Sequence, residues 1–264
     1  MLQGLMGNGL ITSEGDFWQR QRQLTQPMFH QQRINGYGRV MVDYTERMLQ
    51  TWQEGQVLNI HDAMMHLTRD IVMKTIFGQD ITEREADNIT YALDEAMNWF
   101  IMQMQVPNPG NMQTWLNLGS NIIAWVLHVV GLRGKQASSI ERSYQYAITL
   151  LDETVYPMIQ QRRQSGSEGD DLLGMLMQIQ DADDGSRLSD QQLRDEVITI
   201  ILAGHETTTN TLSWTWMLLA QHPQVYKKLF QELHNVLRGC LKSFEEVILI
   251  TPVALTSNES LQHK

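Results

Sequence analysis

The sequence predicts a mainly α-helical protein with a long central helix and little or no sheet. Apolar residues recur three and four positions apart along most of the 264-residue chain, which is the helical period. The chain holds only 6 prolines, and the alternation of period two that is typical of strands is hard to find. No internal repeat and no shift of composition divides the sequence, so we expect a single domain over residues 1–264.

The first part of the chain is expected to form four helices, at residues 16–30, 36–52, 61–77 and 83–105. Pro27 interrupts the first helix, because proline has no amide hydrogen to continue the helical ladder. Gly55 and Gly78 follow the second and third helices, where glycine is a common stop signal. The fourth helix ends before Pro107, and residues 106–110 are predicted to form a loop.

The middle of the chain contains an apolar segment with few charges, residues 113–142. A clean helical face follows over residues 138–163. Three further segments are expected in sequence: a polar linker at 165–170, a short helix at 171–180 and an acidic loop at 181–187.

The strongest helical pattern begins at the capping residue Ser189 and runs to His222, where Pro223 ends it. Acidic side chains in its first turns suit the positive end of the helix dipole. At about 1.5 Å per residue, a helix of this length crosses a whole domain. A last amphipathic helix is expected over residues 223–237.

Composition excludes several classes of function. Lys plus Arg is 20 and Asp plus Glu is 30, which gives a net charge of −10 and argues against nucleic acid as a partner. The single cysteine, Cys240, excludes an internal disulfide framework and a cysteine-rich zinc site. The longest apolar run, residues 122–130, is shorter than the ~18–20 residues that span a bilayer, and residues 1–12 lack a secretory signal pattern.

Six residues inside the long helix, Ala203 to Thr208, break several local rules together. An interior glycine, Gly204, costs about 1 kcal/mol relative to alanine. Each neighbouring threonine hydroxyl can bond to the carbonyl four residues earlier and bend the helix, and a carboxylate at 206 is expensive to bury. This combination favours equally a widened functional turn and a close helix–helix contact. Thr209 excludes a His-Glu-x-x-His zinc site.

These six residues, A-G-H-E-T-T, match the (Ala/Gly)-Gly-x-(Asp/Glu)-Thr-(Thr/Ser) motif and so resemble the cytochrome P450 family. In that family the helix lies over the haem and its glycine turn makes the oxygen pocket. The resemblance implies that Ala203 and Gly204 contact the cofactor. It also implies that Glu206 and Thr207 are the acid and alcohol that deliver protons to bound dioxygen.

A second match to the family is the Trp-x-x-x-Arg pattern at Trp18 and Arg22. Residues four apart share a helix face, so an indole N–H and a guanidinium can reach one carboxylate. The resemblance implies that these two side chains bind a haem propionate. The residues on both sides of this helix also resemble the family's stretch.

A third match is degenerate, because Gln262 stands where the family's Glu-x-x-Arg helix has arginine after Glu259. Cys240 lacks the surrounding residues of the family's thiolate loop and precedes the Glu259 segment, so it is not the haem ligand. We therefore expect an internal fragment of a cytochrome P450 domain. Residues 113–142 form an atypical apolar insert that could be a membrane-touching lid, and residues 240–264 form a degenerate tail.

The resemblance implies a monooxygenase that inserts one oxygen atom of O2 into an apolar organic substrate, with b-type haem and a ferredoxin or flavin reductase as redox partner. We assign no metal-ligating residue in this chain, and we expect this chain alone to be inactive without the thiolate loop. The alternative is a non-catalytic decayed fragment or a helical interaction or lipid-associated protein. A cytoplasmic location is expected.

Overall fold

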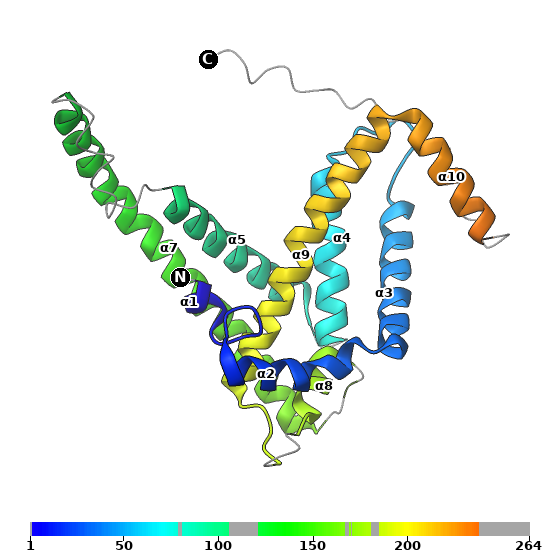
Figure 1. The fold of residues 1–264 in the computed structure, drawn as a ribbon, viewed down its shortest axis with the longest axis horizontal. Coiled ribbons are helices and arrows are strands. Elements are labelled where there is room, and N and C mark those ends of the chain that lie inside the picture. Colours follow the sequence, from blue (N-terminus) through cyan, green and yellow to red (C-terminus); the bar gives the residue numbers. More distant parts are fainter. Residues whose placement is uncertain are drawn as a thin grey trace. The chain divides into compact units, whose positions relative to one another are not determined.

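The computed structural model of the chain describes residues 2–78, 81–105, 121–166, 169, 171–180 and 185–237. Side chains are described for these residues except 2, 103–105, 121–140 and 237. The predicted loop at 106–110 and the tail at 240–264 lie outside this range. Within the described residues the structure is helical, and β pairing is limited to an isolated antiparallel bridge between Gln180 and Arg187 (Figure 1). The mainly α class is confirmed.

The helices follow one another in the order α1 Leu2–Met6, α2 Gly15–Thr25, the 3-10 turn η1 Gln26–Phe29, α3 Gln31–Gln50, α4 Ile60–Phe77, α5 Glu83–Gln105, α7 Asn121–Ser165, α8 Leu172–Gln178, α9 Asp190–Gln221 and α10 Pro223–Leu237. The bounds expected for α5 and α10 are confirmed to the residue, and those of α4 and α9 to within one residue. The interruption predicted at Pro27 is the change from α2 to η1.

Two helices begin earlier than predicted. The α3 helix starts at Gln31, ahead of the predicted start at Gly36. The α7 helix starts at Asn121, so residues 121–142, most of the predicted insert, are the first half of a continuous helix. None of the described helices is both long enough and apolar enough to cross a membrane.

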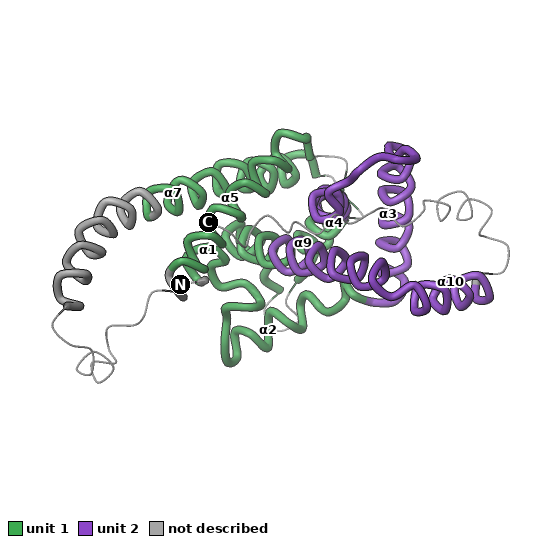
Figure 2. The backbone as a smooth tube through the Cα atoms, turned by 90° about the horizontal axis from the view of Figure 1, so that it is seen from above, with its two compact units in different colours: residues 1–29, 76–200 green, residues 30–75, 201–264 purple. Residues whose placement is uncertain are grey.

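The chain forms two compact units (Figure 2). Unit 1 comprises residues 1–29 and 76–200, and unit 2 comprises residues 30–75 and 201–264. In unit 1, α5 lies along α7, and the Trp99 and Tyr144 rings stack with centroids 4.1 Å apart. Its core is aliphatic, and the largest fully buried side chain is Phe77.

Unit 1 also contains a buried ion pair. Arg162 on α7 donates to both carboxylate oxygens of Asp171, at 3.1 and 2.9 Å, and to the carbonyl of Phe77 at 3.0 Å. The Asp171 carboxylate accepts the amide hydrogen of Gly174 at 2.8 Å and so caps α8. One carboxylate therefore joins two helices and stabilises the first turn of α8.

Unit 2 is built on α4 and the second part of α9. Met64, Leu67, Met73 and Ile201 are buried there, and two polar residues of α9, His205 and Thr209, are buried with them. These two side chains fix how α9 is turned about its axis, and they fix which residues of the A-G-H-E-T-T segment face outward.

Candidate functional site

The buried face of α9 is held to α4 by two polar contacts within unit 2. The His205 Nε2 atom lies 3.2 Å from the carbonyl oxygen of Met65. The hydroxyls of Thr209 and Thr68 lie 2.6 Å apart, and both residues are buried. Because both contacts satisfy polar groups inside the unit, they orient α9 as well as stabilise it.

Gly204 lies at the edge of the same helix contact. A Cβ atom at this position would lie 3.3 Å from Cγ2 of Val72, tighter than ordinary packing. The close helix–helix contact expected as one alternative is therefore present. The helix stays α-helical through Gly204, so the predicted widening does not interrupt it.

The opposite face of α9 is open. Ala203 and Thr207 are exposed there, and Glu206 is half-buried between the two faces. A helix whose one face packs on α4 thus presents a small residue, a hydroxyl and a carboxylate together. This exposed face is consistent with the other alternative, a functional turn, which stays a prediction.

Back-bonding to the helix is predicted for Thr207, Thr208, Thr209 and Thr211, and it is present for Thr207, Thr209 and Thr211. Thr207 Oγ1 donates to the carbonyl of Ala203 at 2.6 Å, and Thr209 Oγ1 donates to that of His205 at 3.0 Å. The same bond recurs from Thr211, Ser213 and Thr215 to the carbonyls four residues earlier, at 2.8, 2.8 and 2.7 Å. These bonds hold the hydroxyl protons against the backbone.

The Trp18 and Arg22 side chains share one face of α2 in unit 1, as their spacing predicts. The guanidinium carbon of Arg22 lies 5.1 Å from the centroid of the Trp18 ring, which is a cation–π contact. Arg22 is exposed and Trp18 is half-buried. The stacked guanidinium keeps its planar set of donors available for an anionic group. That this pair and the α9 face serve one cofactor stays a prediction.

Taken separately within each unit, the residues at the two predicted contacts are compatible with a haem. The face around Ala203 and Thr207 has no bulky side chain from these two positions, and Arg22 offers donors to a propionate. Cys240, Glu259 and Gln262 lie outside the described residues. Among the residues that are described, no group of three or more His, Cys, Asp or Glu side chains is placed to hold a metal ion.

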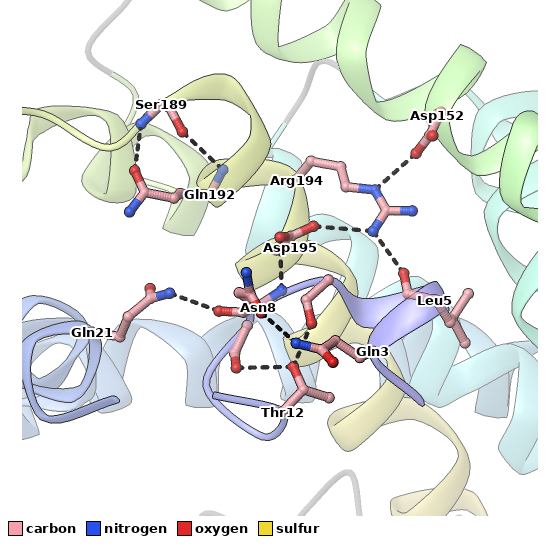
Figure 3. Close-up of polar contacts among 12 residues, drawn as sticks. Gln3, Leu5, Asn8, Thr12, Gln21, Asp152, Ser189, Gln192, Arg194 and Asp195 are labelled. Carbon is pink, nitrogen blue, oxygen red and sulfur yellow. Dashed lines mark hydrogen bonds and ion pairs between the residues drawn. The ribbon is translucent and has the colours of Figure 1, made fainter. Parts of the chain in front are cut away.

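A second polar cluster, which the sequence analysis missed, surrounds the start of α9 in unit 1 (Figure 3). Buried Arg194 donates to the carbonyl of Leu5 at 2.6 Å, to Asp152 at 2.8 Å and to Asp195 at 3.1 Å. Asp195 accepts the amide hydrogen of Asn8 at 2.9 Å. The available signal was the run Arg194-Asp195-Glu196 between apolar Leu193 and Val197, since three charges there cannot all face solvent.

Comparison with known proteins identifies the family. The family model described as Cytochrome P450 matches residues 2–247. The chain belongs to the cytochrome P450 family, and members of this family bind haem.

The similar proteins include bacterial monooxygenases. Cyclooctat-9-en-7-ol 5-monooxygenase of Streptomyces melanosporofaciens is 29% identical over 92% of this chain and 48% of its own length. A bifunctional cytochrome P450/NADPH–P450 reductase of Bacillus subtilis is 27% identical over 97% of this chain and 23% of its own length. The crystal structure of the cytochrome P450DA heme domain matches with a TM-score of 0.71 and 28% identity, over 90% of this chain and 48% of that one. The chain spans about half the length of the first of these relatives.

Proposed function

We propose that this chain supplies the distal part of a haem-dependent monooxygenase that acts on an apolar organic substrate. The observation that carries the proposal is the open face of α9, where exposed Ala203 and Thr207 lie beside half-buried Glu206 while the opposite face is fixed to α4. Haem, when bound, supplies the activation of O2 and the insertion of one oxygen atom into a C–H bond.

The residues of this chain bind and orient. Ala203 and Gly204 leave room on the helix face for the haem and for dioxygen. Arg22, held over the Trp18 ring, neutralises a propionate and donates hydrogen bonds to it. None of these roles needs a change in the described helices.

Glu206 and Thr207 transfer protons between solvent and the open face. The Thr207 hydroxyl donates its proton to the carbonyl of Ala203, so its oxygen keeps lone pairs that accept a hydrogen bond from a group on the open face. Glu206 is half-buried, so its carboxyl reaches solvent and exchanges protons with it. To pass a proton, the Thr207 hydroxyl turns away from the Ala203 carbonyl, donates its proton to the open face and accepts one from the Glu206 carboxyl, which takes up a proton from solvent in return.

The relatives support the coarse outline of substrate and partner. Their names include a pentalenene oxygenase and a 5-monooxygenase of cyclooctat-9-en-7-ol, and three are bifunctional with an NADPH–P450 reductase. We propose a small apolar organic substrate and an electron-donating protein partner, either a ferredoxin or a flavin reductase. A cytoplasmic location remains a prediction, which cell fractionation tests.

We further propose that this 264-residue chain is inactive by itself, since its one cysteine, Cys240, does not stand in a thiolate-loop sequence. The test is the reduced, CO-bound difference spectrum of the purified chain with added haem. We expect no band of the thiolate-ligated type. Such a band would contradict the proposal that the axial cysteine is absent from this chain.

The acid–alcohol role is tested in a chimera that joins this chain to the thiolate-loop segment of a relative. Thr207→Val is expected to keep reductant consumption and to lower product formed per electron pair, because the proton path ends at the hydroxyl. Thr211→Val is the matched control, since it removes the same kind of back-bonded, exposed hydroxyl one turn further on. Equal losses in both variants would refute the role of Thr207.

A further inference from the structure

The segment of residues 7–13, here called the N-terminal loop, rests directly on the first turns of α9. The amide of Asn8 donates to Asp195 Oδ2 at 2.9 Å (Figure 3). The amide of Leu10 donates to Glu196 Oε2 at 3.4 Å. Gly9 has no room for a side chain, since a Cβ atom there would lie 2.7 Å from the carbonyl oxygen of Asp195 and would overlap the hydroxyl of Thr199. The loop and the helix are therefore in contact through their backbones.

The contact leaves several buried polar atoms without hydrogen-bond partners. In the part of the chain that the structure describes, five buried side-chain atoms have none, and four of them surround this loop: Ser13 Oγ, Gln21 Oε1, Glu196 Oε1 and Thr199 Oγ1. An unpaired buried polar atom destabilises the folded state, and an unpaired carboxylate oxygen does so most. Protonation of Glu196 adds a hydrogen-bond donor at this place and removes the buried charge.

Among the described residues, no cation acts on Glu196 to balance its charge. The side chain is fully buried. On its own helix, Asp195 adds a second negative charge, and buried Arg194 is held by Asp195 and by Asp152 of α7. The loop, with the sequence G-N-G-L-I-T-S, carries no charged side chain, and the buried residue of α2 at this contact is Gln21.

We propose that Glu196 is a proton-binding site that controls docking of the N-terminal loop on α9. With the proton bound, the carboxyl is neutral and donates one hydrogen bond to an acceptor among the unpaired oxygens around it. When the proton leaves, a carboxylate is buried beside Asp195 without a cation, and the loop separates from α9 so that water reaches the charge.

The electrostatics of the site agree with this geometry. Burial raises the pKa of the Glu196 carboxyl from 4.5 to about 7. The hydrogen bond from the Leu10 amide opposes this rise, and the negative charge of Asp195 adds a smaller increase. The docked loop therefore holds a proton that the undocked loop releases over this range. Docking is favoured at acidic pH and weakens as the pH rises through about 7.

The test measures hydrogen exchange of the Asn8 and Leu10 amides in the full chain at about pH 5.5 and about pH 8, corrected for intrinsic exchange rates. A proton linked to docking over this interval changes the docking equilibrium by more than about tenfold. We expect protection of both amides to fall by this factor in the wild-type chain. In Glu196→Gln, which keeps the size and removes the charge, protection is expected to be the same at both pH values.

Glu153→Gln is the matched control, because Glu153 is an exposed glutamate of unit 1 and its variant should keep the wild-type pH dependence. A pH-independent wild type, or a Glu196→Gln variant that keeps the wild-type fall, overturns the proposal. If the Glu196 variant does not fold, the wild-type Glu196 carboxyl is titrated directly by carbon NMR. A titration above about pH 6 supports the proposal, and an ordinary glutamate titration overturns it.

Discussion

The buried ion pair of unit 1 allows a sharp test of what one charge contributes to the fold. The side chains of Arg162 and Asp171 are 4% and 11% exposed, and their atoms approach to 2.9 Å. Asp171→Asn keeps the shape of the side chain and an oxygen that can accept the amide hydrogen of Gly174. It removes the negative charge and replaces one of the two oxygens that accept from Arg162 with an amide nitrogen. The guanidinium of Arg162 then remains buried without the Asp171 charge beside it.

The expected loss of unfolding free energy follows from removal of the Asp171 charge beside the buried guanidinium. Removing one partner of a buried pair typically destabilises a protein by about 3–5 kcal/mol, and the remaining hydrogen bond from Arg162 to Phe77 places this case near the lower end, about 3 kcal/mol. Asp171→Ala also loses the α8 cap, which adds about 1 kcal/mol. Since domains are stable by about 5–15 kcal/mol, either change is a large fraction of the total.

Urea unfolding followed by far-UV circular dichroism measures the difference in unfolding free energy. The control is Arg163→Gln on the next residue of α7, whose ion pair with Asp190 is 34% and 38% exposed. That pair should contribute less than about 1 kcal/mol because solvent screens it. If Asp171→Asn costs no more than Arg163→Gln, the argument from burial is wrong. The double variant Arg162→Met with Asp171→Asn should be milder than Asp171→Asn alone, since no charge is left buried.

Three further variants and conditions test other parts of the structure. Thr209→Val should cost about 1–3 kcal/mol by leaving the buried Thr68 hydroxyl without its partner, and the double variant with Thr68→Val should cost less than the sum of the singles in urea unfolding. Ser189→Ala should lower the unfolding free energy by about 1 kcal/mol, because Ser189 and Gln192 bond reciprocally at the start of α9. Thermal unfolding measures this loss, and an unchanged stability would exclude the cap. The raised pKa of Glu196 means that the folded state keeps a proton which the unfolded chain releases above pH 4.5. The unfolding free energy should therefore fall by up to about 3 kcal/mol as the pH rises from 4.5 through about 7. Urea titrations that give the same unfolding free energy at every pH would contradict this.

Helix positions were predictable where periodic sequence meets a strong stop signal. The bounds of α5 and α10 follow from apolar spacing ended by Pro107 or begun at Pro223. The starts of α3 and α7 were predicted too late, since both helices begin before the predicted residue and continue through glycines. Propensity is a weak signal, and continuation of a helix through glycine depends on context that spacing does not contain.

The candidate site was predictable where its geometry is local. Back-bonding of Thr207 and the shared face of Trp18 and Arg22 both follow from a separation of four residues. The contacts of the N-terminal loop with Asp195 and Glu196 join residues 187 and 186 positions apart. No local pattern encodes such a pairing. From the sequence, Glu196 was interpreted only as one of the acidic residues that suit the helix dipole, and its burial was not predictable.

The hydroxyl bonds along α9 have a consequence for anything that approaches its open face. Every fourth residue of this face is exposed: Ala203, Thr207, Thr211 and Thr215. The hydroxyl of each of the three threonines donates its hydrogen to a backbone carbonyl. A row that is polar in composition therefore offers an incoming molecule methyl groups and oxygen lone pairs, with few free donors. Such a surface suits a broad, flat and apolar molecule better than a hydrated sugar or ion.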